Sequence, residues 1–366
     1  MPTDPQLKPW IEELRPYVPG KSKSDDGRTL IKLSANENPL GCSPAALDAL
    51  RDPGNPADYP DPGALELTKA IGKLHGIDPA LIVCGTGSGE LLHCAVQAYA
   101  GPGDEVLFSQ YSFSLYPLIT RKVGAVPVAV KDENFVASVD AILAAVTDKT
   151  RVVLLDNPNN PCGTHLARDE VRRLHQGLPG NVLLVLDQAY AEYVDDGMDD
   201  DGLVLAWEAS NVLVTRTFSK AYGLAGLRIG WATGAPAIVA GLQRLRGAFN
   251  VSTQGQNAAC AALADQEFVE RSRQANARGR QRLIEAVQAL GNHGLRAIPS
   301  QANFVLVLFE GEVTAEAALK VLADAGYAVR NNPSPALPDA LRITIGSEQH
   351  MDDVIATLRQ LCGEAA

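Results

Sequence analysis

Short apolar runs alternate with amphipathic stretches through the first two thirds of the chain. The clearest runs are residues 81–83, 105–108, 125–130, 151–155, 182–186 and 212–214. Several of them are apolar almost throughout, which is typical of strands that helices cover on both faces. Strands of this kind, separated by helical stretches, predict an α/β domain with a mainly parallel sheet.

The pattern changes after about residue 253. A long helical stretch at 265–290 precedes an apolar run at 303–309, a further helical stretch and a strand-like run at 341–345. Strands packed against helices in this order predict a smaller α+β domain. The first residues are polar and rich in Pro and Gly, which favours an extended arm. We therefore expect an arm at 1–43, a large domain at 44–255 and a small domain at 256–366.

Composition narrows the class of protein. The 366 residues are 46% apolar and 20% charged, as in soluble globular proteins, and the net charge of -11 argues against a nucleic-acid binder. The six cysteines form no Cys-x-x-Cys pair, which favours a reduced protein without disulfides or zinc. The N-terminus lacks a signal-peptide pattern and no apolar run approaches the ~20 residues that span a bilayer. We expect a cytoplasmic protein with neither nucleic acid nor membrane as a partner, and no metal.

Lys220 carries the strongest chemical signal. It follows the apolar run 212–214, with the hydroxyls of Thr217 and Ser219 before it and the guanidinium of Arg228 after it. An amine can form a Schiff base with an aldehyde, and hydroxyls with a guanidinium can bind a phosphate. The alternative is a surface lysine after a strand. The combination nevertheless suits a cofactor that carries both an aldehyde and a phosphate.

Two further motifs follow predicted strands. Asp187 directly follows the run 182–186, and Tyr190 stands three residues later. The segment Asn157-Pro-Asn-Asn-Pro-Cys-Gly163 follows the run 151–155. A buried carboxylate needs a partner, such as a protonated pyridine nitrogen. Tyr190 and Asn160 could then reach the oxygen on the same ring. The alternative for Asp187 and Tyr190 is a helix N-cap and a core tyrosine.

A glycine-rich segment and an aromatic residue complete the predicted cofactor site. Cys84-Gly-Thr-Gly-Ser-Gly-Glu90 joins a predicted strand to a predicted helix, so Gly87 and Ser88 are expected to bind a phosphate at the helix N-terminus. The segment is neither a dinucleotide fingerprint nor a P-loop. Phe113 could stack on a flat ring, although core packing is equally compatible with its position.

Arg330 and Arg342 lie in the predicted small domain, and Arg342 interrupts an otherwise apolar strand. Arginines at strand positions are often solvated edges. If both face a ligand, their guanidinium groups could recognise a phosphate or a carboxylate.

These motifs appear in an order and spacing that resemble the fold-type-I pyridoxal 5'-phosphate (PLP) aminotransferases. Asp187-x-x-Tyr190 and Ser219-Lys-x-x-Gly-Leu-x-Gly-x-Arg228 carry this likeness together with the Asn-Pro run. Three further segments resemble the histidinol-phosphate aminotransferase branch: Leu14-Arg-Pro-Tyr-Val-Pro-Gly-Lys21, Leu33-Ser-Ala-Asn-Glu-Asn-Pro-Leu-Gly41 and Tyr59-Pro-Asp61. The likeness covers nearly the whole chain. It departs at Gly89, where relatives often have Asp or Asn.

The resemblance implies a seven-stranded-type sheet in the large domain and a homodimer with shared active sites. Tyr59 would reach the phosphate of PLP in the neighbouring subunit. Tyr17, Asn36, Arg330 and Arg342 would bind the substrate. Lys220, Asp187 and Tyr190 would be the catalytic residues.

The reaction implied by the resemblance is transamination between L-histidinol phosphate and 2-oxoglutarate, giving imidazole-acetol phosphate and L-glutamate in histidine biosynthesis. An aromatic amino acid aminotransferase or a threonine-phosphate decarboxylase could use nearly the same framework. A nicotinamide-dependent oxidoreductase is disfavoured because the chain lacks a dinucleotide fingerprint. A non-catalytic PLP-binding module is disfavoured because Lys220 is present.

Overall fold

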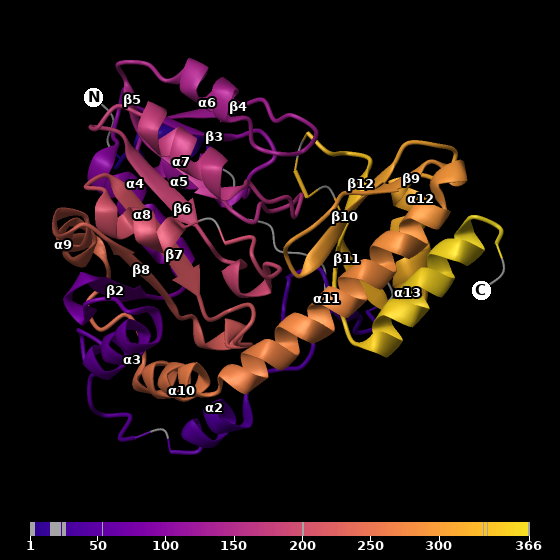
Figure 1. Ribbon diagram of the computed structural model, residues 1–366, viewed down its shortest axis with the longest axis horizontal. Helices are drawn as coiled ribbons and strands as arrows, with labels where there is room; N and C mark the ends of the chain where they lie inside the picture. The colour runs from indigo at the N-terminus through magenta and orange to yellow at the C-terminus, as the bar shows by residue number, and fades with distance from the viewer. Residues whose placement is uncertain are drawn as a thin grey trace.

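The computed structural model describes residues 4–14, 23, 27–52, 54–199, 201–331, 333–334 and 336–364. Two β-sheets with their helices form the molecule (Figure 1). The larger sheet has seven strands in the order β2-β8-β7-β6-β5-β3-β4. Only β8 runs against the others. The strands are β2 (Ile82–Gly85), β3 (Glu105–Ser109), β4 (Val126–Val130), β5 (Thr150–Asp156), β6 (Leu183–Asp187), β7 (Val212–Thr217) and β8 (Gly230–Gly234).

The predicted α/β class and mainly parallel sheet are confirmed. Each of the six predicted strands of the first two thirds overlaps an observed one. β8 is an additional strand that begins and ends with glycine. A Cβ atom at Gly230 would lie 2.3 Å from the backbone N of Ser88, and one at Gly234 would lie 2.7 Å from the carbonyl oxygen of Val212. Close backbone approach, rather than an apolar run, therefore accounts for this strand.

Helices cover both faces of the seven-stranded sheet. On one face, α4 (Ser88–Tyr99), α5 (Leu115–Lys122) and α9 (Pro236–Leu245) share an apolar cluster with Val185 of β6. On the other, α6 (Val139–Ala145), α7 (Arg168–Gly177) and α8 (Gly202–Glu208) share a second cluster with Leu184. Successive residues of one strand are thus buried on opposite faces, which explains why the strands are apolar almost throughout.

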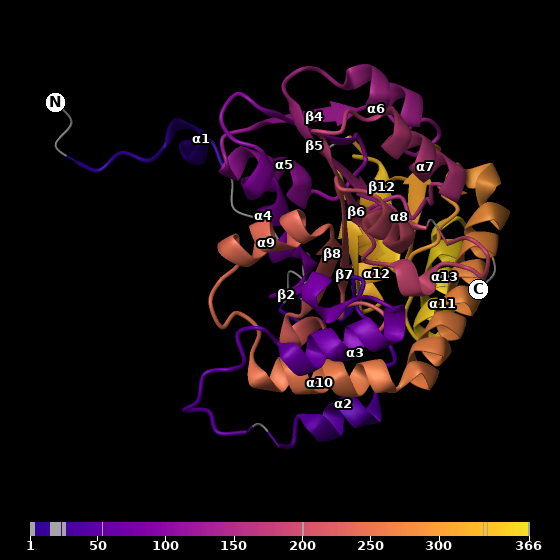
Figure 2. The ribbon, with the colours of Figure 1, turned by 60° about the vertical axis from the view of Figure 1, so that its left-hand side comes forward.

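A third group of helices lies at the β2 edge. It consists of α2 (Pro44–Ala49), α3 (Leu65–His75) and α10 (Thr253–Ala264), which lie side by side in Figure 2. The boundary expected between residues 255 and 256 falls inside α10. The division into domains remains a prediction.

The smaller sheet has five strands in the order β1-β11-β12-β10-β9. The predicted helix at 265–290 is α11 (Gln266–Ala289), which runs from α10 to this sheet (Figure 1) and packs there with α12 (Ala315–Asp324) and α13 (Glu348–Leu361). β1 belongs to the segment expected as an arm, and it pairs parallel to β11. The strands are β1 (Ile31–Leu33), β9 (Leu295–Ala297), β10 (Phe304–Phe309), β11 (Tyr327–Asn331) and β12 (Ala340–Thr344).

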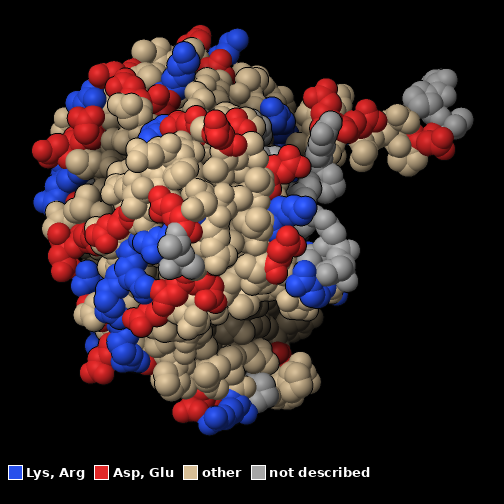
Figure 3. All heavy atoms as spheres, turned by 90° about the vertical axis from the view of Figure 1, so that its right-hand side faces the viewer, with Lys and Arg blue, Asp and Glu red and all other residues tan. Residues whose placement is uncertain are grey.

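In the described part of the N-terminal segment, the short helix α1 (Pro9–Glu12) lies against α5 (Figure 2). On the face shown in Figure 3, basic and acidic side chains are interspersed. Within the described ranges, no helix combines the length and the apolar composition needed to span a bilayer.

Candidate active site

One cavity collects residues from both sheets. It lies at the carboxyl ends of β5, β6 and β7 and extends to β11 and β12 of the smaller sheet. Open α/β sheets bind ligands at these strand ends. Most residues predicted for the site line this cavity: Asn36, Ser88, Phe113, Asn160, Asp187, Tyr190, Thr217, Ser219, Lys220, Arg228, Arg330 and Arg342.

Asp187 presents a buried carboxylate at the end of β6. Thr215 donates its hydroxyl hydrogen to Oδ1 at 3.1 Å, and Tyr116 donates its own to Oδ2 at 3.2 Å. Burial raises the pKa of Asp187 to about 6, although both hydrogen bonds act to lower it. The carboxylate is thus oriented by two donors, and a cation in the cavity would stabilise its charged form.

Tyr116 was not singled out from the sequence. It is fully buried in α5, and its pKa is raised well above the ordinary value because of burial and the neighbouring charge of Asp187. Its phenol therefore remains a donor at neutral pH. Sequence reasoning could identify Tyr116 only as an apolar position of an amphipathic helix.

Lys220 reaches the cavity from the segment after β7. Its Nζ atom donates to the backbone carbonyl of Ala35 at 2.9 Å and lies 5.8 Å from the centre of the Tyr190 ring. Burial lowers the pKa of Lys220 to about 7, and the positive charge of Arg342 acts in the same direction. A large fraction of the amine is therefore uncharged near neutral pH, as a base or nucleophile requires.

Tyr190 and Asn36 form a buried pair beside Lys220. The side-chain amide of Asn36 donates to the hydroxyl of Tyr190 at 2.8 Å, and Thr344 donates to Oδ1 of Asn36 at 3.0 Å. Asn36 has a φ of 57°, a left-handed conformation that asparagine adopts more readily than most residues. Burial raises the pKa of Tyr190 to about 12. Tyr190 is thus a neutral hydroxyl in a fixed orientation.

The opposite end of the cavity is built to receive an anion. Ser88 begins α4, and the side chain of Arg228 lies beside the preceding Gly87. Arg228 donates from Nη1 to the hydroxyl of Ser219 at 3.3 Å, and Thr217 donates to the same hydroxyl at 3.0 Å. A helix N-terminus, a guanidinium and hydroxyls at one place suit a phosphate.

Two left-handed backbone conformations allow the side chain of Arg228 to lie against Gly87 at this end of the cavity. Gly87 has a φ of 84°, and a Cβ atom there would lie 2.7 Å from Nη2 of Arg228. Arg228 itself has a φ of 56°, which is uncommon for a bulky residue. A left-handed arginine that other contacts hold in place is typical of a functional site. Replacement of Gly87 by any larger residue would displace the guanidinium.

Asn160 is fixed by a residue that sequence reasoning missed. Oδ2 of Asp156 accepts the backbone N–H groups of Asn160 at 2.8 Å and of Phe113 at 3.2 Å. The side-chain oxygen of Asn160 accepts a hydrogen bond from Arg342 at 2.5 Å. Asp156 therefore ties the Asn160 loop to the Phe113 loop. The sequence signal was its position after an apolar run, the same signal that identified Asp187.

Arg330 and Arg342 stand opposite each other on neighbouring antiparallel strands. Both line the cavity, and Arg342 is only 8% exposed. Like charges directly opposite each other in a sheet are destabilising. The two guanidinium groups could together receive an anion at this end of the cavity.

Tyr59 is not among the residues that line the cavity. Tyr59 is 81% exposed and stacks on Phe249, with ring centroids 4.5 Å apart. Tyr17 lies outside the described residues. Gly89 lines the cavity, and a Cβ atom there would meet only Leu115, at an ordinary 3.5 Å. The part of the chain that the structure describes contains no cluster of potential metal ligands.

Comparison with known proteins agrees with this geometry. Residues 28–358 match the model of the family described as aminotransferase class I and II. The chain is 60% identical to a histidinol-phosphate aminotransferase of Erythrobacter litoralis, covering 100% of this chain and 99% of the relative. It is 54% identical to a protein of the same name from Zymomonas mobilis, covering 100% of each.

Among solved structures, the fold matches a histidinol-phosphate aminotransferase from Sinorhizobium meliloti in complex with pyridoxal-5'-phosphate. The TM-score is 0.90 at 31% identity, with 98% of each chain covered. This chain therefore belongs to the class I and II aminotransferase family.

Proposed function

We propose that this chain is a PLP-dependent histidinol-phosphate aminotransferase. It transfers the amino group between L-histidinol phosphate and 2-oxoglutarate, giving imidazole-acetol phosphate and L-glutamate. Relatives of that name at 54–60% identity over 96–100% of their length support the proposal. The observation that carries it is one cavity lined by Lys220 and Asp187, with Arg228 at one end and Arg330 and Arg342 at the other.

The residues present fit PLP. Gly87, Ser88, Thr217, Ser219 and Arg228 would hold its phosphate at the N-terminus of α4. When bound, PLP supplies an aldehyde that links to amino groups and a ring that withdraws electrons from the reacting carbon.

The remaining cofactor residues would orient the ring. The buried carboxylate of Asp187 would pair with the protonated ring nitrogen, which supplies the cation that this carboxylate needs. Phe113 would stack on the ring, and Asn160 and Tyr190 would bind its 3-oxygen. Tyr190 suits this role because its pKa, raised to about 12 by burial, keeps it a hydrogen-bond donor.

Lys220 would act as both anchor and base. Its amine would hold the cofactor through the aldehyde until an amino substrate binds. The free amine would accept the proton from Cα of the substrate and later donate it again. A pKa of about 7 leaves about half of the amine able to accept a proton at neutral pH. The hydrogen bond to Ala35 holds it at the cavity wall.

The end of the cavity at Arg330 and Arg342 would bind the phosphate of histidinol phosphate. Arg330 and Arg342 supply two guanidinium groups, and Tyr17 and Asn36 would add further donors. When glutamate or 2-oxoglutarate is the substrate, the same arginines would bind one of its carboxylates. The two substrates share an anionic end, so one site can serve both.

The Arg342→Lys variant tests the substrate assignment. Lysine keeps the charge but loses the planar fork, so KM for histidinol phosphate should rise about 10- to 100-fold, the loss expected for a charge-assisted hydrogen bond. KM for L-histidinol, which carries neither a phosphate nor a carboxylate, should change much less. The measurement is steady-state kinetics of wild type and variant with both substrates. A wild type that prefers phenylalanine, or that releases carbon dioxide from threonine phosphate, would move the substrate assignment to another aminotransferase-fold enzyme.

We also infer a homodimer in which each active site uses two chains. Tyr59 is exposed and stacked on Phe249, away from the cavity of its own chain. In the dimer it would reach the phosphate of PLP in the neighbouring subunit. The enzyme would work in the cytoplasm, with small-molecule substrates and without nucleic acid or membrane partners.

Hybrid dimers test the shared site. Lys220→Ala and Tyr59→Ala homodimers should each have low activity. After the two are unfolded and refolded together, half of the dimers are hybrids, and one site of each hybrid has both residues intact. Activity should therefore recover to about a quarter of wild type. A mixture that stays at the average of its two parents would contradict the shared site.

A further inference from the structure

The segment before β10 contacts both loops that carry predicted cofactor residues. We call residues 157–163 the β5 loop, which carries Asn160, and residues 188–196 the β6 loop, which carries Tyr190. The backbone N–H of Gln301 donates to the carbonyl of Gly163 in the β5 loop at 2.7 Å. Its side chain pairs with Asp195 in the β6 loop. One residue of the smaller-sheet half thus joins two loops of the larger-sheet half.

The pairing of Gln301 with Asp195 is reciprocal. The backbone N–H of Asp195 donates to Oε1 of Gln301 at 3.0 Å, and Nε2 of Gln301 donates to Oδ2 of Asp195 at 2.9 Å. Only a side chain with one acceptor and one donor can make both bonds. Glutamate or methionine at this position would lose at least one of them.

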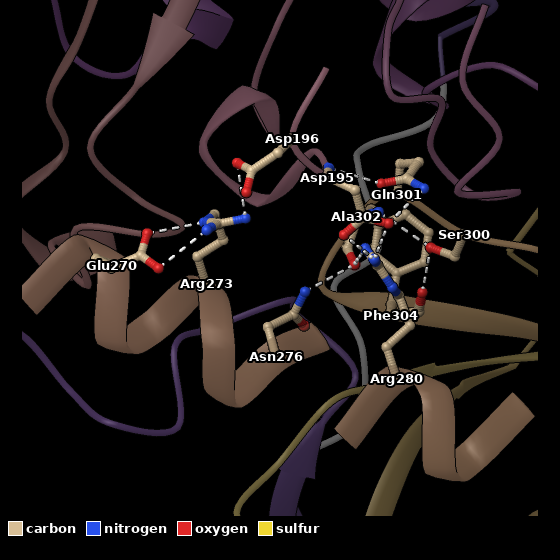
Figure 4. A network of polar contacts seen from close by, with 10 residues as sticks. All are labelled: Asp195, Asp196, Glu270, Arg273, Asn276, Arg280, Ser300, Gln301, Ala302 and Phe304. Carbon is tan, nitrogen blue, oxygen red and sulfur yellow. Dashed lines mark hydrogen bonds and ion pairs between the residues drawn. The ribbon is translucent and has the colours of Figure 1, made fainter. Parts of the chain in front are cut away.

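Arg280 of α11 completes the arrangement. Figure 4 shows Arg280 and Asn276 projecting from the helix toward Asp195 and Ala302. Arg280 is 5% exposed, and its Nη2 atom lies 2.8 and 3.0 Å from the two carboxylate oxygens of Asp195. The side chain of Asp195 is 44% exposed, so its loss would leave the buried charge of Arg280 uncompensated. The Arg273–Asp196 ion pair nearby is of a different kind, because Asp196 is 91% exposed.

The segment that contains Gln301 continues into Asn303 and Phe304, which contact residues of the cavity. Phe304 packs edge-on against Tyr190, with ring centroids 5.3 Å apart, and the guanidinium of Arg342 lies 5.1 Å from the Phe304 ring. The side chain of Asn303 donates to the carbonyl of Asn36 at 3.0 Å. A displacement of residues 300–304 would therefore shift residues proposed to bind the cofactor and residues proposed to bind the substrate together.

On the basis of the proposed function, we infer that Gln301 is a positioning residue of the active site. Through its pair with Asp195, supported by Arg280, it sets the relative placement of the β5 and β6 loops, and hence of Asn160 and Tyr190. It contacts neither substrate nor cofactor itself. Misplacement of catalytic groups by about 1 Å can reduce a rate about 100-fold, so such an indirect role has measurable consequences.

An exchange of the two side chains tests this role. Gln301→Glu places a carboxylate against that of Asp195, and Asp195→Asn removes the counter-charge of Arg280. The double variant Asp195→Asn/Gln301→Glu restores a donor opposite an acceptor, keeps the net charge and leaves a carboxylate near Arg280. Gln301→Met, which removes both side-chain bonds, serves if a single charged variant does not fold. Glu310→Gln is the matched control, because Glu310 forms an exposed ion pair with Arg296 in the neighbouring β9–β10 hairpin.

The measurements are kcat with histidinol phosphate, the dissociation constant of PLP from the PLP-free protein, the pH midpoint of the visible absorption of bound PLP, and the melting temperature. We expect each single variant to lower kcat about tenfold or more and to shift the absorption midpoint, because Asn160 and Tyr190 would contact the 3-oxygen of the ring. The double variant should return kcat and the midpoint to within about threefold and a few tenths of a pH unit of wild type. Glu310→Gln should match wild type.

A purely structural role predicts a different outcome. If the single variants melt earlier but keep the kcat and the absorption midpoint of wild type, Gln301 is not a positioning residue. A double variant no better than the single variants would also overturn the inference. A wild type that binds PLP but does not transaminate histidinol phosphate would overturn the proposed substrate, while the PLP affinity and the absorption midpoint would still test Gln301.

Discussion

Replacement of Lys220 by alanine is expected to abolish turnover while preserving the fold. The amine is the group in the cavity whose lowered pKa, about 7, suits proton transfer at neutral pH. Its removal should reduce kcat by about 10⁴-fold, the upper end of what a general acid–base contributes. Some PLP affinity should remain, because Arg228, Ser219 and the N-terminus of α4 are unaffected. The measurements are kcat with histidinol phosphate and a titration of the PLP-free variant with PLP.

Two further variants serve as controls for Lys220→Ala: one keeps the positive charge at position 220, and the other removes an unrelated lysine. Lys220→Arg keeps a positive charge, but an arginine does not lose its proton at neutral pH, so this variant should be as inactive as Lys220→Ala. Lys69→Ala removes an exposed lysine of α3 and should behave as wild type. Turnover of Lys220→Ala comparable to wild type would eliminate Lys220 as the base.

Replacement of Asp187 is expected to have the second-largest effect. Asp187→Ala should weaken PLP binding and suppress the reaction, because it removes the carboxylate that we propose pairs with the ring nitrogen. Loss of a charge-assisted hydrogen bond predicts a PLP dissociation constant about 10- to 100-fold higher. The fall in kcat should be about 10²- to 10³-fold, as for other preorganised electrostatic contacts. Kinetics at saturating PLP separate the two effects.

The isosteric variant Asp187→Asn makes the test sharper. It preserves the volume and allows contacts with Thr215 and Tyr116, but it removes the negative charge. It should therefore resemble Asp187→Ala in kcat. Thr215→Val, which removes only one of the two hydrogen bonds to the carboxylate, should cost much less. An Asp187→Asn enzyme with kcat within about threefold of wild type would mean that the charge is not required.

The cavity residues at the carboxyl ends of the strands could be predicted from the sequence for a physical reason. Asp187, the Asn160 loop and Lys220 each follow an apolar run, and parallel strands bring their carboxyl ends to one edge of the sheet. The resemblance to known aminotransferases added Asn36 and assigned Arg330 and Arg342, already candidates from their strand positions, to the substrate. The structure puts all three in the same cavity.

Other parts depend on contacts that local sequence does not encode. Asn36 bonds to Tyr190 and to Thr344, which are 154 and 308 residues away. In the sequence, Tyr116 cannot be distinguished from any other buried position of an amphipathic helix. Only the packing of α5 on the sheet brings its hydroxyl within hydrogen-bond distance of Asp187. β8 lacks a long apolar run because its terminal glycines lie against neighbouring backbone. Periodicity identifies which positions are buried, whereas only the fold identifies what they face.

The most direct test of the central claim is the visible absorption spectrum of the purified protein, recorded before and after addition of histidinol phosphate without an oxo-acid acceptor. We predict that the band of bound PLP disappears, that the band of its amine form appears, and that 2-oxoglutarate then restores the original spectrum. A band that responds to phenylalanine but not to histidinol phosphate would contradict the proposed substrate. No band, even after PLP is supplied, would contradict the proposed function as a whole.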